Sequence, residues 1–306
     1  MTDMALNETR LNHRTGLVLT AIGGTLFTFD VPLARLAMTD QWTLIFVRGV
    51  FLALAITIFW LAFRRINGTR LPFINGWAGI IVAVTNTLAN ILFLSAVTKT
   101  TAANLVFILA LNPIFCAVLA WLFLSERIHR WTWVAVATSV FGVCIIVWDG
   151  LAVGTFVGDM MAVGVALCTA IALTVIRKTG KNVVTSLAVG SLVSAGFALF
   201  WGAQPSTLAP EGWGWLAMNG LLVIPLASGL IALGPRYLPA PEVAMFFLLD
   251  VVLTPVWIWL IFDEIPTTQA LIGGAIVFAT LFIHGVWRFV TSKQVSEEEL
   301  FVSGVR

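Results

Sequence analysis

The sequence predicts an all-α integral membrane protein with ten transmembrane helices, arranged as two inverted five-helix repeats around a central cavity. Three observations support this fold class. The chain of 306 residues is 59% hydrophobic and only 10% charged, which leaves too little polar surface to cover a water-soluble globule. Its apolar runs are each about 20 residues long, which is enough to cross a bilayer. A stretch of the first half also returns, in altered form, in the second half.

The ten expected spans are apolar runs separated by short polar or charged connections. They are 17–38, 43–63, 76–97, 102–124, 131–148, 158–176, 184–202, 213–234, 241–262 and 267–288. The expected domains are an N-terminal tail (1–15), a first five-helix repeat (16–150), a second, inverted repeat (151–290) and a C-terminal tail (291–306). The connections are too short to hold a soluble domain.

The internal repeat pairs residues 102–126 with residues 240–264. A shift of 138 residues, which is 240 minus 102, superposes Asn112 on Asp250. Both copies carry a polar residue midway in an apolar run, followed by aromatic residues and then by a glutamate at the end of the run. Because five spans are an odd number, the second repeat is expected to enter the membrane from the opposite face. We therefore expect Asn112 and Asp250 near the bilayer midplane, where the halves meet.

The basic residues predict the orientation of the chain. If the first span leaves the cytoplasm, fourteen of the seventeen lysines and arginines fall on the cytoplasmic side. Only Arg35 and Lys99 fall outside, and Arg48 lies within the second span. This asymmetry is the positive-inside pattern, so both tails are predicted to be cytoplasmic.

Catalytic and metal-binding motifs are absent from the sequence. It has no nucleotide-binding glycine loop and no cluster of His, Asp and Glu at metal-ligand spacing, so we expect neither an enzyme nor a cofactor. The three cysteines fall within expected spans and are odd in number, which favours small packing residues over disulfides. His284, in the last span, is either a hydrogen-bonded packing residue or a proton relay. A membrane-embedded enzyme or scaffold is the alternative from another class.

Asp30 in the first expected span and Arg48 in the second are charged residues at comparable depth. Charges inside a membrane are costly unless they are paired or face a wet cavity. The two residues therefore either neutralise each other as a structural ion pair, or one of them contacts substrate or a coupling proton. Pro32 follows Asp30 closely, frees a backbone carbonyl and permits a kink.

Asparagines in the third and fourth spans are candidates for substrate binding. Asn86 and Asn90 are four residues apart and share one helix face, and Asn112 precedes Pro113. An amide both donates and accepts hydrogen bonds, which suits a zwitterion, although membrane helices also use amides to bond to one another. Pro113 and Pro255 are expected to loosen the fourth and ninth spans near the polar residues of the repeat.

Asp250 is the acid at the centre of the ninth expected span, and it should face the protein interior because a lipid-facing carboxylate is costly. Phe107, Met245 and Phe246 are expected at similar depth, and Ser228 is a small polar residue of the eighth span. These residues suit either core packing or a pocket for an amino acid with a large apolar side group.

Several motifs, in order and spacing, resemble those of the drug/metabolite transporter superfamily, in particular tandem EamA-type repeats. They are Val47-Arg48-Gly49, Thr100-Thr101-Ala102-Ala103, Asn112-Pro113, Leu124-Ser125-Glu126-Arg127 and Gly158-Asp159. The resemblance covers residues 15–289. Two departures concern the site: residues 25–29 replace a tryptophan-glycine pair of the family, and Val251 replaces a proline.

The sequence is also similar to YddG-type bacterial exporters of aromatic amino acids. This resemblance implies export of phenylalanine, tryptophan, tyrosine and similar apolar amino acids across the bacterial inner membrane. The inverted repeat itself favours alternating access between the halves, and we expect no cofactor, no nucleic-acid partner, and a monomer or weak dimer in the bilayer. The alternative is efflux of lipophilic cations, with Asp30 or Asp250 exchanging substrate for protons. A sugar phosphate is disfavoured, because phosphate needs convergent cations and the spans offer only Arg48.

Overall fold

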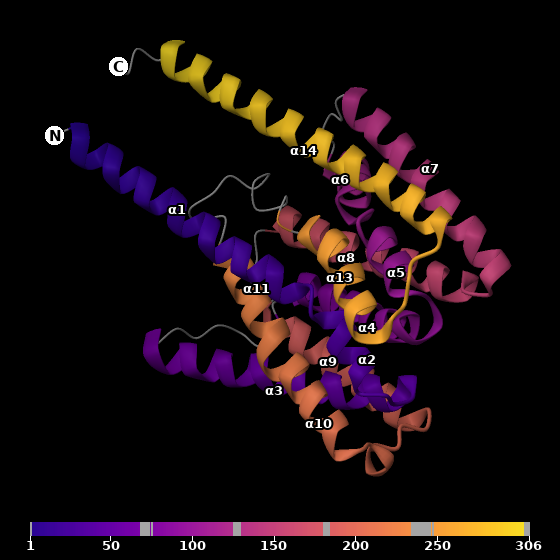
Figure 1. Ribbon diagram of the computed structural model, residues 1–306. Helices are drawn as coiled ribbons and strands as arrows, with labels where there is room; N and C mark the ends of the chain where they lie inside the picture. Colours follow the sequence, from indigo (N-terminus) through magenta and orange to yellow (C-terminus); the bar gives the residue numbers. More distant parts are fainter. Residues whose placement is uncertain are drawn as a thin grey trace.

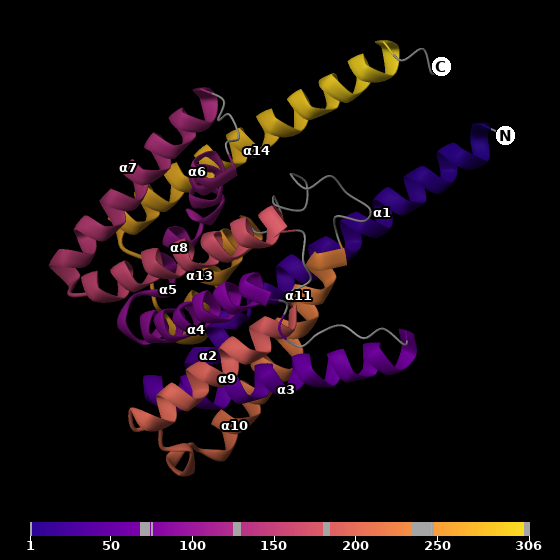
Figure 2. The same cartoon turned by 180° about the vertical axis from the view of Figure 1, so that it is seen from behind.

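The computed structural model describes residues 2–67, 74, 76–124, 130–179, 184–233, 246 and 248–302, and all regular elements within these ranges are helices. The first half contains α1 (Thr2–Phe27), α2 (Asp30–Leu36), α3 (Gln41–Asn67), α4 (Gly76–Lys99), α5 (Ala102–Leu109), α6 (Asn112–Leu124) and α7 (Arg130–Val153). The second half contains α8 (Phe156–Thr179), α9 (Val184–Phe200), η1 (Pro205–Thr207), α10 (Pro210–Ala217), η2 (Met218–Val223), α11 (Ile224–Leu233), α13 (Leu248–Phe262) and α14 (Thr268–Val302). The start of α1 and the end of α14 lie at the same end of the bundle (Figures 1 and 2).

Eight helical stretches of the described chain are long and apolar enough to cross a membrane. They are Thr15–Leu36, Gln41–Arg65, Gly76–Lys99, Ala102–Phe123, Arg130–Leu151, Phe156–Ile176, Pro210–Ile231 and Thr268–Trp287. Two shorter apolar helices, Thr185–Phe200 and Leu248–Phe262, coincide with the seventh and ninth expected spans. The prediction of an all-α, multi-pass membrane protein is confirmed. The count of ten spans and the inversion of the repeat stay predictions.

Two of the expected spans are broken within the bilayer-spanning region. The first divides at Thr28 and Phe29, between α1 and α2, and the fourth divides between α5 and α6. The break at Thr28 lies four residues before Pro32, because a proline ring clashes with the carbonyl of residue i−4 and has no N–H for it. Pro113 lies in the first turn of α6, a position where a missing N–H costs nothing.

The ninth expected span differs from its prediction. Helix α13 continues through Pro255, so the expected loosening at this proline is wrong for the described helix. Asp250 lies in the first turn of α13 rather than at the centre of a helix. Residues 241–245 of this span lie outside the described residues.

The bundle core is built from contacts between the two halves. The most extensive helix pairs are α4 with α8, α3 with α9, α7 with α14, α1 with α11, and α4 with α9. Small residues let these helices approach closely: a Cβ added at Gly49 would lie 2.7 Å from the Ser191 carbonyl, and one at Gly190 would lie 2.6 Å from the Ala83 carbonyl. The interface of the halves therefore runs through the middle of the molecule.

Candidate functional site

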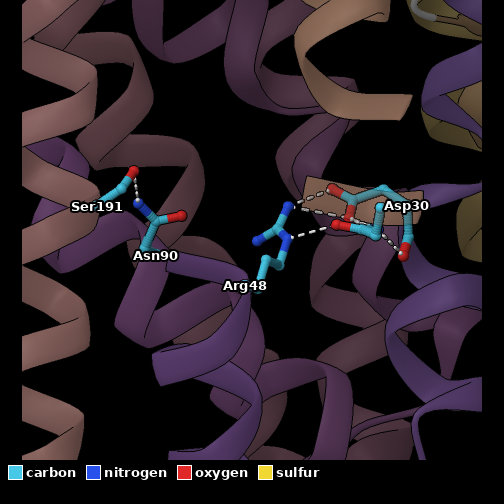
Figure 3. Close-up of polar contacts among 5 residues, drawn as sticks. Asp30, Arg48, Asn90 and Ser191 are labelled. Atoms are coloured by element: carbon cyan, nitrogen blue, oxygen red, sulfur yellow. Dashed lines mark hydrogen bonds and ion pairs between the residues drawn. The ribbon is translucent and has the colours of Figure 1, made fainter. Parts of the chain in front are cut away.

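An ion pair joins the buried Arg48 to the partly buried Asp30 where helices of both halves meet (Figure 3). Arg48 Nη2 donates to both carboxylate oxygens of Asp30 at 2.9 Å. Arg48 extends from α3 and is only 5% exposed, and Asp30 is the first residue of α2, after the break at Thr28. A buried guanidinium without a partner is strongly destabilising, so each charge stabilises the other at this depth.

Asn219 connects the ion pair to the second half. Its Oδ1 accepts from Arg48 Nε at 2.8 Å, and its Nδ2 donates to Asp30 Oδ1 at 2.9 Å. Asn219 is fully buried in the π-helical turn η2, and such turns often mark functional sites. The sequence analysis missed this residue, although it is a polar residue in an apolar run, the same signal that singled out Asn86.

One edge of the Arg48 guanidinium remains available. Its Nη1 makes no hydrogen bond to any residue that the structure describes. The Phe93 ring of α4 lies against the guanidinium, with 5.2 Å between Arg48 Cζ and the ring centroid. Asn90 lies one turn before Phe93, and its Nδ2 donates to Ser191 Oγ at 3.4 Å. Figure 3 shows Asn90 between Ser191 and Arg48, with its amide oxygen turned toward Arg48.

Asn86, one turn before Asn90, bonds to a neighbouring helix. Its Nδ2 donates to the Leu187 carbonyl of α9 at 3.0 Å. Thr87 Oγ1 lies 3.1 Å from the Gly190 carbonyl of the same helix. These bonds hold α4 against α9, which is the interhelical role of polar groups in membrane helices.

The other candidates from the sequence are spread over several elements. Asn112 begins α6, where its Oδ1 accepts from the Cys116 thiol at 3.2 Å. Phe107 is buried against Gly274, where an added Cβ would lie 2.4 Å from the ring. Ser228 is exposed on α11, and Phe246 packs against Ile231, as Leu17 and Phe27 also do. Met245 lies outside the described residues. No hydrogen bond or ion pair within the described ranges joins these side chains to Arg48.

Asp250 lies beside the break between α1 and α2. The Thr254 hydroxyl, one turn further along α13, is 2.5 Å from Asp250 Oδ1 and 3.0 Å from the Thr28 carbonyl oxygen. Trp257 Nε1 donates to the Thr28 hydroxyl at 3.0 Å, and the Trp257 ring stacks on Phe29 at 5.1 Å. Helix α13 therefore holds the broken segment that carries Asp30.

A second polar cluster surrounds Asp159 in the first turn of α8. Asp159 is fully buried and accepts hydrogen bonds from Thr100, from Asn104 at 3.3 Å and from Thr155 at 3.2 Å. Thr100 and Asn104 belong to the turn between α4 and α5 and to α5 itself. The cluster therefore fixes this turn of the first half on the start of the second half.

Both halves match one family model. The EamA-like transporter family covers residues 14–148 and 156–285. The chain belongs to the EamA-like transporter family. Membership makes it a multi-pass membrane transporter with a small-molecule substrate, and the resemblance to EamA-type repeats is confirmed.

The fold of this EamA-like transporter also has a counterpart among solved structures. A crystal structure described only as that of a protein matches it with a TM-score of 0.62 at 12% identity, over 88% of this chain and 96% of the other. At that identity the likeness concerns the fold alone. No curated protein matches the chain in sequence. The nature of the substrate therefore has to be argued from the residues of the site.

Proposed function

We propose that this EamA-like transporter exports aromatic and other apolar amino acids across the bacterial inner membrane by alternating access between its halves. The observation that carries the proposal is the Asp30–Arg48 pair with its free guanidinium edge. The pair has no net charge, Arg48 is only 5% exposed, and Nη1 has no partner among the described residues. An unused donor beside a neutral ion pair suits an anionic group that arrives with the substrate.

The charge balance of the site favours a zwitterion. An amino acid needs a donor for its carboxylate and acceptors for its ammonium, with no net charge to compensate. Arg48 Nη1 supplies the donor, and the Asn90 amide oxygen and the Asp30 carboxylate supply acceptors. A phosphate would need several convergent cations, and Arg48 is the one cation that the described residues place in this cluster.

The surroundings of Arg48 favour an apolar side group on the substrate. Phe93 lies directly against the guanidinium, and the stacked pair of Phe29 and Trp257 lies beside Asp30 at the break before α2. Aromatic rings stabilise one another in offset or edge-to-face contacts at 4.5–7 Å between centroids, an interaction of about 1 kcal/mol. In this proposal the substrate's path also passes Asn112, Ser228, Met245 and Phe246, whereas Asn86 and Phe107 position the helices.

Alternating access is supported by the origin of the groups in the cluster. Asp30, Arg48 and Asn90 belong to the first half, and Ser191 and Asn219 belong to the second. A movement of one half against the other therefore changes the surroundings of any substrate bound between them, as rocking transporters require.

The matched pair Asn90→Ala and Asn86→Ala tests the site. Uptake of labelled phenylalanine is measured with purified protein in proteoliposomes, together with thermal stability. We expect Asn90→Ala to raise KM roughly tenfold, since about 1.4 kcal/mol of lost interaction is tenfold, with little change in stability. Asn86→Ala is expected to lower stability at nearly normal KM. An unchanged KM in Asn90→Ala removes Asn90 from the site, and a complete lack of phenylalanine uptake by the wild-type protein refutes the substrate.

Efflux of lipophilic cations is the second candidate, and Asp250 is the observation that favours it. Among the described residues no Lys, Arg or His side chain lies within ion-pair distance of Asp250. A carboxyl group without a cationic partner suits a cationic substrate. Transport of a labelled lipophilic cation by the wild-type protein, abolished in Asp250→Asn, would establish this function. Failure of the same cation to compete with phenylalanine favours amino acid export.

A further inference from the structure

The carbonyl of Thr28 depends on a side chain for its hydrogen bond. In an unbroken helix it would accept from the N–H of residue 32, but residue 32 is proline and has no N–H. No backbone N–H group of the described residues donates to the Thr28 carbonyl oxygen. Thr28 is fully buried, and so is Thr254, whose hydroxyl lies 3.0 Å from the Thr28 carbonyl oxygen. Since a buried carbonyl without a donor is costly, the single proton of Thr254 belongs to this bond.

The short contact between the Thr254 hydroxyl and the Asp250 carboxyl group then needs a proton that Thr254 does not supply. Thr254 Oγ1 and Asp250 Oδ1 are 2.5 Å apart, and two oxygens at this distance require a hydrogen between them. A hydroxyl has one proton and two acceptor sites. With its proton directed at Thr28, Thr254 acts as an acceptor toward Asp250. The hydrogen between them is therefore carried by the carboxyl group of Asp250.

We propose that Asp250 is the proton-binding residue of this transporter, and that in this conformation it is neutral and donates to Thr254, which donates to the Thr28 carbonyl. The coupling of this proton to export rests on the proposed function. The protonation state itself does not, because it follows from the donors and acceptors around Thr254.

The charges on the neighbouring helices agree with a neutral Asp250. Helices α1, α2, α5 and α14 pack against α13. Helix α5 has no titratable side chain, and those of α1 lie in its first fourteen residues. On α2, Arg35 is bound to Glu264 and Asp30 is bound to Arg48. On α14, His284 is the first titratable residue and it bonds to Thr132.

Loss of the proton has a direct structural consequence. Once Asp250 releases its proton to water, the carboxylate competes for the proton of Thr254, and the Thr28 carbonyl loses its donor. The break between α1 and α2 is then held only by the contacts of Trp257 with Thr28 and Phe29. Because α2 begins with Asp30, the partner of Arg48, a shift of this break changes the substrate site. Proton release and substrate binding would thus be coupled through the break between α1 and α2.

Infrared spectroscopy of the full-length protein in lipid vesicles tests the protonation state without any transport. At neutral pH we expect a carbonyl band of a protonated carboxyl group that disappears in Asp250→Asn and moves to higher frequency in Thr254→Ala, which removes the acceptor. Asp263→Asn is the control, since Asp263 is exposed and its positive φ suits asparagine equally well. If the wild type and Asp250→Asn do not differ in the region of the protonated carboxyl band, and the substitution removes carboxylate bands instead, Asp250 is ionised and the proposal is overturned.

Flux measurements test the coupling. With phenylalanine as probe, we expect the wild type to accumulate substrate in response to a pH gradient. In Asp250→Asn, which cannot exchange a proton, this accumulation should fall at least tenfold while phenylalanine counterflow persists. Gradient-driven accumulation that survives in Asp250→Asn overturns the coupling role. If the wild type moves no phenylalanine in either assay, the substrate is wrong, and the infrared result still decides the protonation of Asp250.

Discussion

Glu264 links Arg35 to the start of α5. Arg35 Nη1 donates to Glu264 Oε2, and Arg35 Nη2 donates to the Thr100 carbonyl at 2.6 Å. Glu264 Oε1 in turn accepts from the backbone N–H of Ala102 at 3.0 Å. Asp263, with a φ of 54°, lies between the end of α13 and Glu264. This contact ties the end of α2 and the α4–α5 turn of the first half to the second half.

Removal of this link should destabilise the packing of α2 and the α4–α5 turn against the second half. We expect Glu264→Gln and Arg35→Gln each to lower the free energy of unfolding by about 1–3 kcal/mol, since the bond is charge-assisted and partly buried. The measurement is a double-mutant cycle in detergent or lipid, in which the two losses should not add. Glu211→Gln, an exposed acid in the first turn of α10, is the control and should cost about 0.5 kcal/mol. Additive losses in the cycle would contradict the link.

Gly150 of α7 is expected to tolerate no side chain. A Cβ at this position would lie 2.0 Å from Asp159 Oδ2, within the buried cluster that fixes α8 on the α4–α5 turn. Gly150→Ala should therefore cost about 2 kcal/mol or more, because it displaces a buried, hydrogen-bonded carboxyl group. Gly196→Ala in α9 is the matched control, with no atom within 4 Å of an added Cβ, and it should stabilise by up to about 1 kcal/mol. Equal midpoints of thermal unfolding for the two variants would refute this reading.

The Asp30–Arg48 pair should show the energetics of a buried ion pair. Asp30→Asn alone leaves the Arg48 guanidinium without its counter-charge and is expected to cost about 3–5 kcal/mol. In Asp30→Asn/Arg48→Gln no charge remains buried, so the double variant should be more stable than Asp30→Asn. Denaturant titration in mixed micelles gives both values. A double variant that is less stable than either single variant would argue against charge compensation as the purpose of the pair.

Asp40 caps the N-terminus of α3 and gives a pH-dependent contribution to stability. Its Oδ1 accepts from the N–H groups of Trp42 at 2.9 Å and Thr43 at 3.1 Å. Partial burial opposes ionisation, but the hydrogen bonds from Thr43 and Trp42 outweigh it and hold the pKa of Asp40 below its usual value. The stabilisation is thus fully present above the ordinary pKa of aspartate and disappears as the pH falls through the lowered value.

Asp40→Ala should accordingly cost about 1 kcal/mol at neutral pH and less in acid. Asp40→Asn keeps an effective cap and should remove this part of the pH dependence. Unfolding free energies of the three proteins at neutral and acidic pH provide the check. A loss in Asp40→Ala that is the same at both pH values would exclude the ionised cap.

The positions of the membrane helices could be predicted because the requirement is local. Each span must be apolar along its length and must satisfy its own backbone hydrogen bonds, so hydropathy alone located the eight long helices and the two shorter ones. The effect of Pro32 was likewise visible, because a proline acts on the carbonyl four residues before it. The effect of Pro255 could not be predicted in this way, since whether a helix bends at a proline depends on the helices packed around it.

The roles of individual polar residues could not be read from the sequence in the same way. Asn86 and Asn90 carry the same side chain on the same helix face, and both donate to Ser191 Oγ at 3.4 Å. Only Asn86 also bonds to the α9 backbone, whereas the amide oxygen of Asn90 is turned toward Arg48. Asn219 was overlooked although it completes the ion pair. Thr254 was overlooked too, because a threonine in an apolar helix commonly bonds to its own backbone and gives no sign of a distant partner.

By itself, the sequence determined that this protein is an all-helical membrane protein with two related halves, and that Asp30, Arg48 and Asp250 need partners inside it. The reason is that a charge within the hydrocarbon region is costly unless it is paired or faces a wet cavity, whatever fold surrounds it. Only the tertiary structure decided which partners they have: Arg48 and Asn219 for Asp30, and Thr254, whose hydroxyl also contacts the Thr28 carbonyl, for Asp250. Hydrogen bonds are short and directional, so these choices depend on how helices from the two halves pack together.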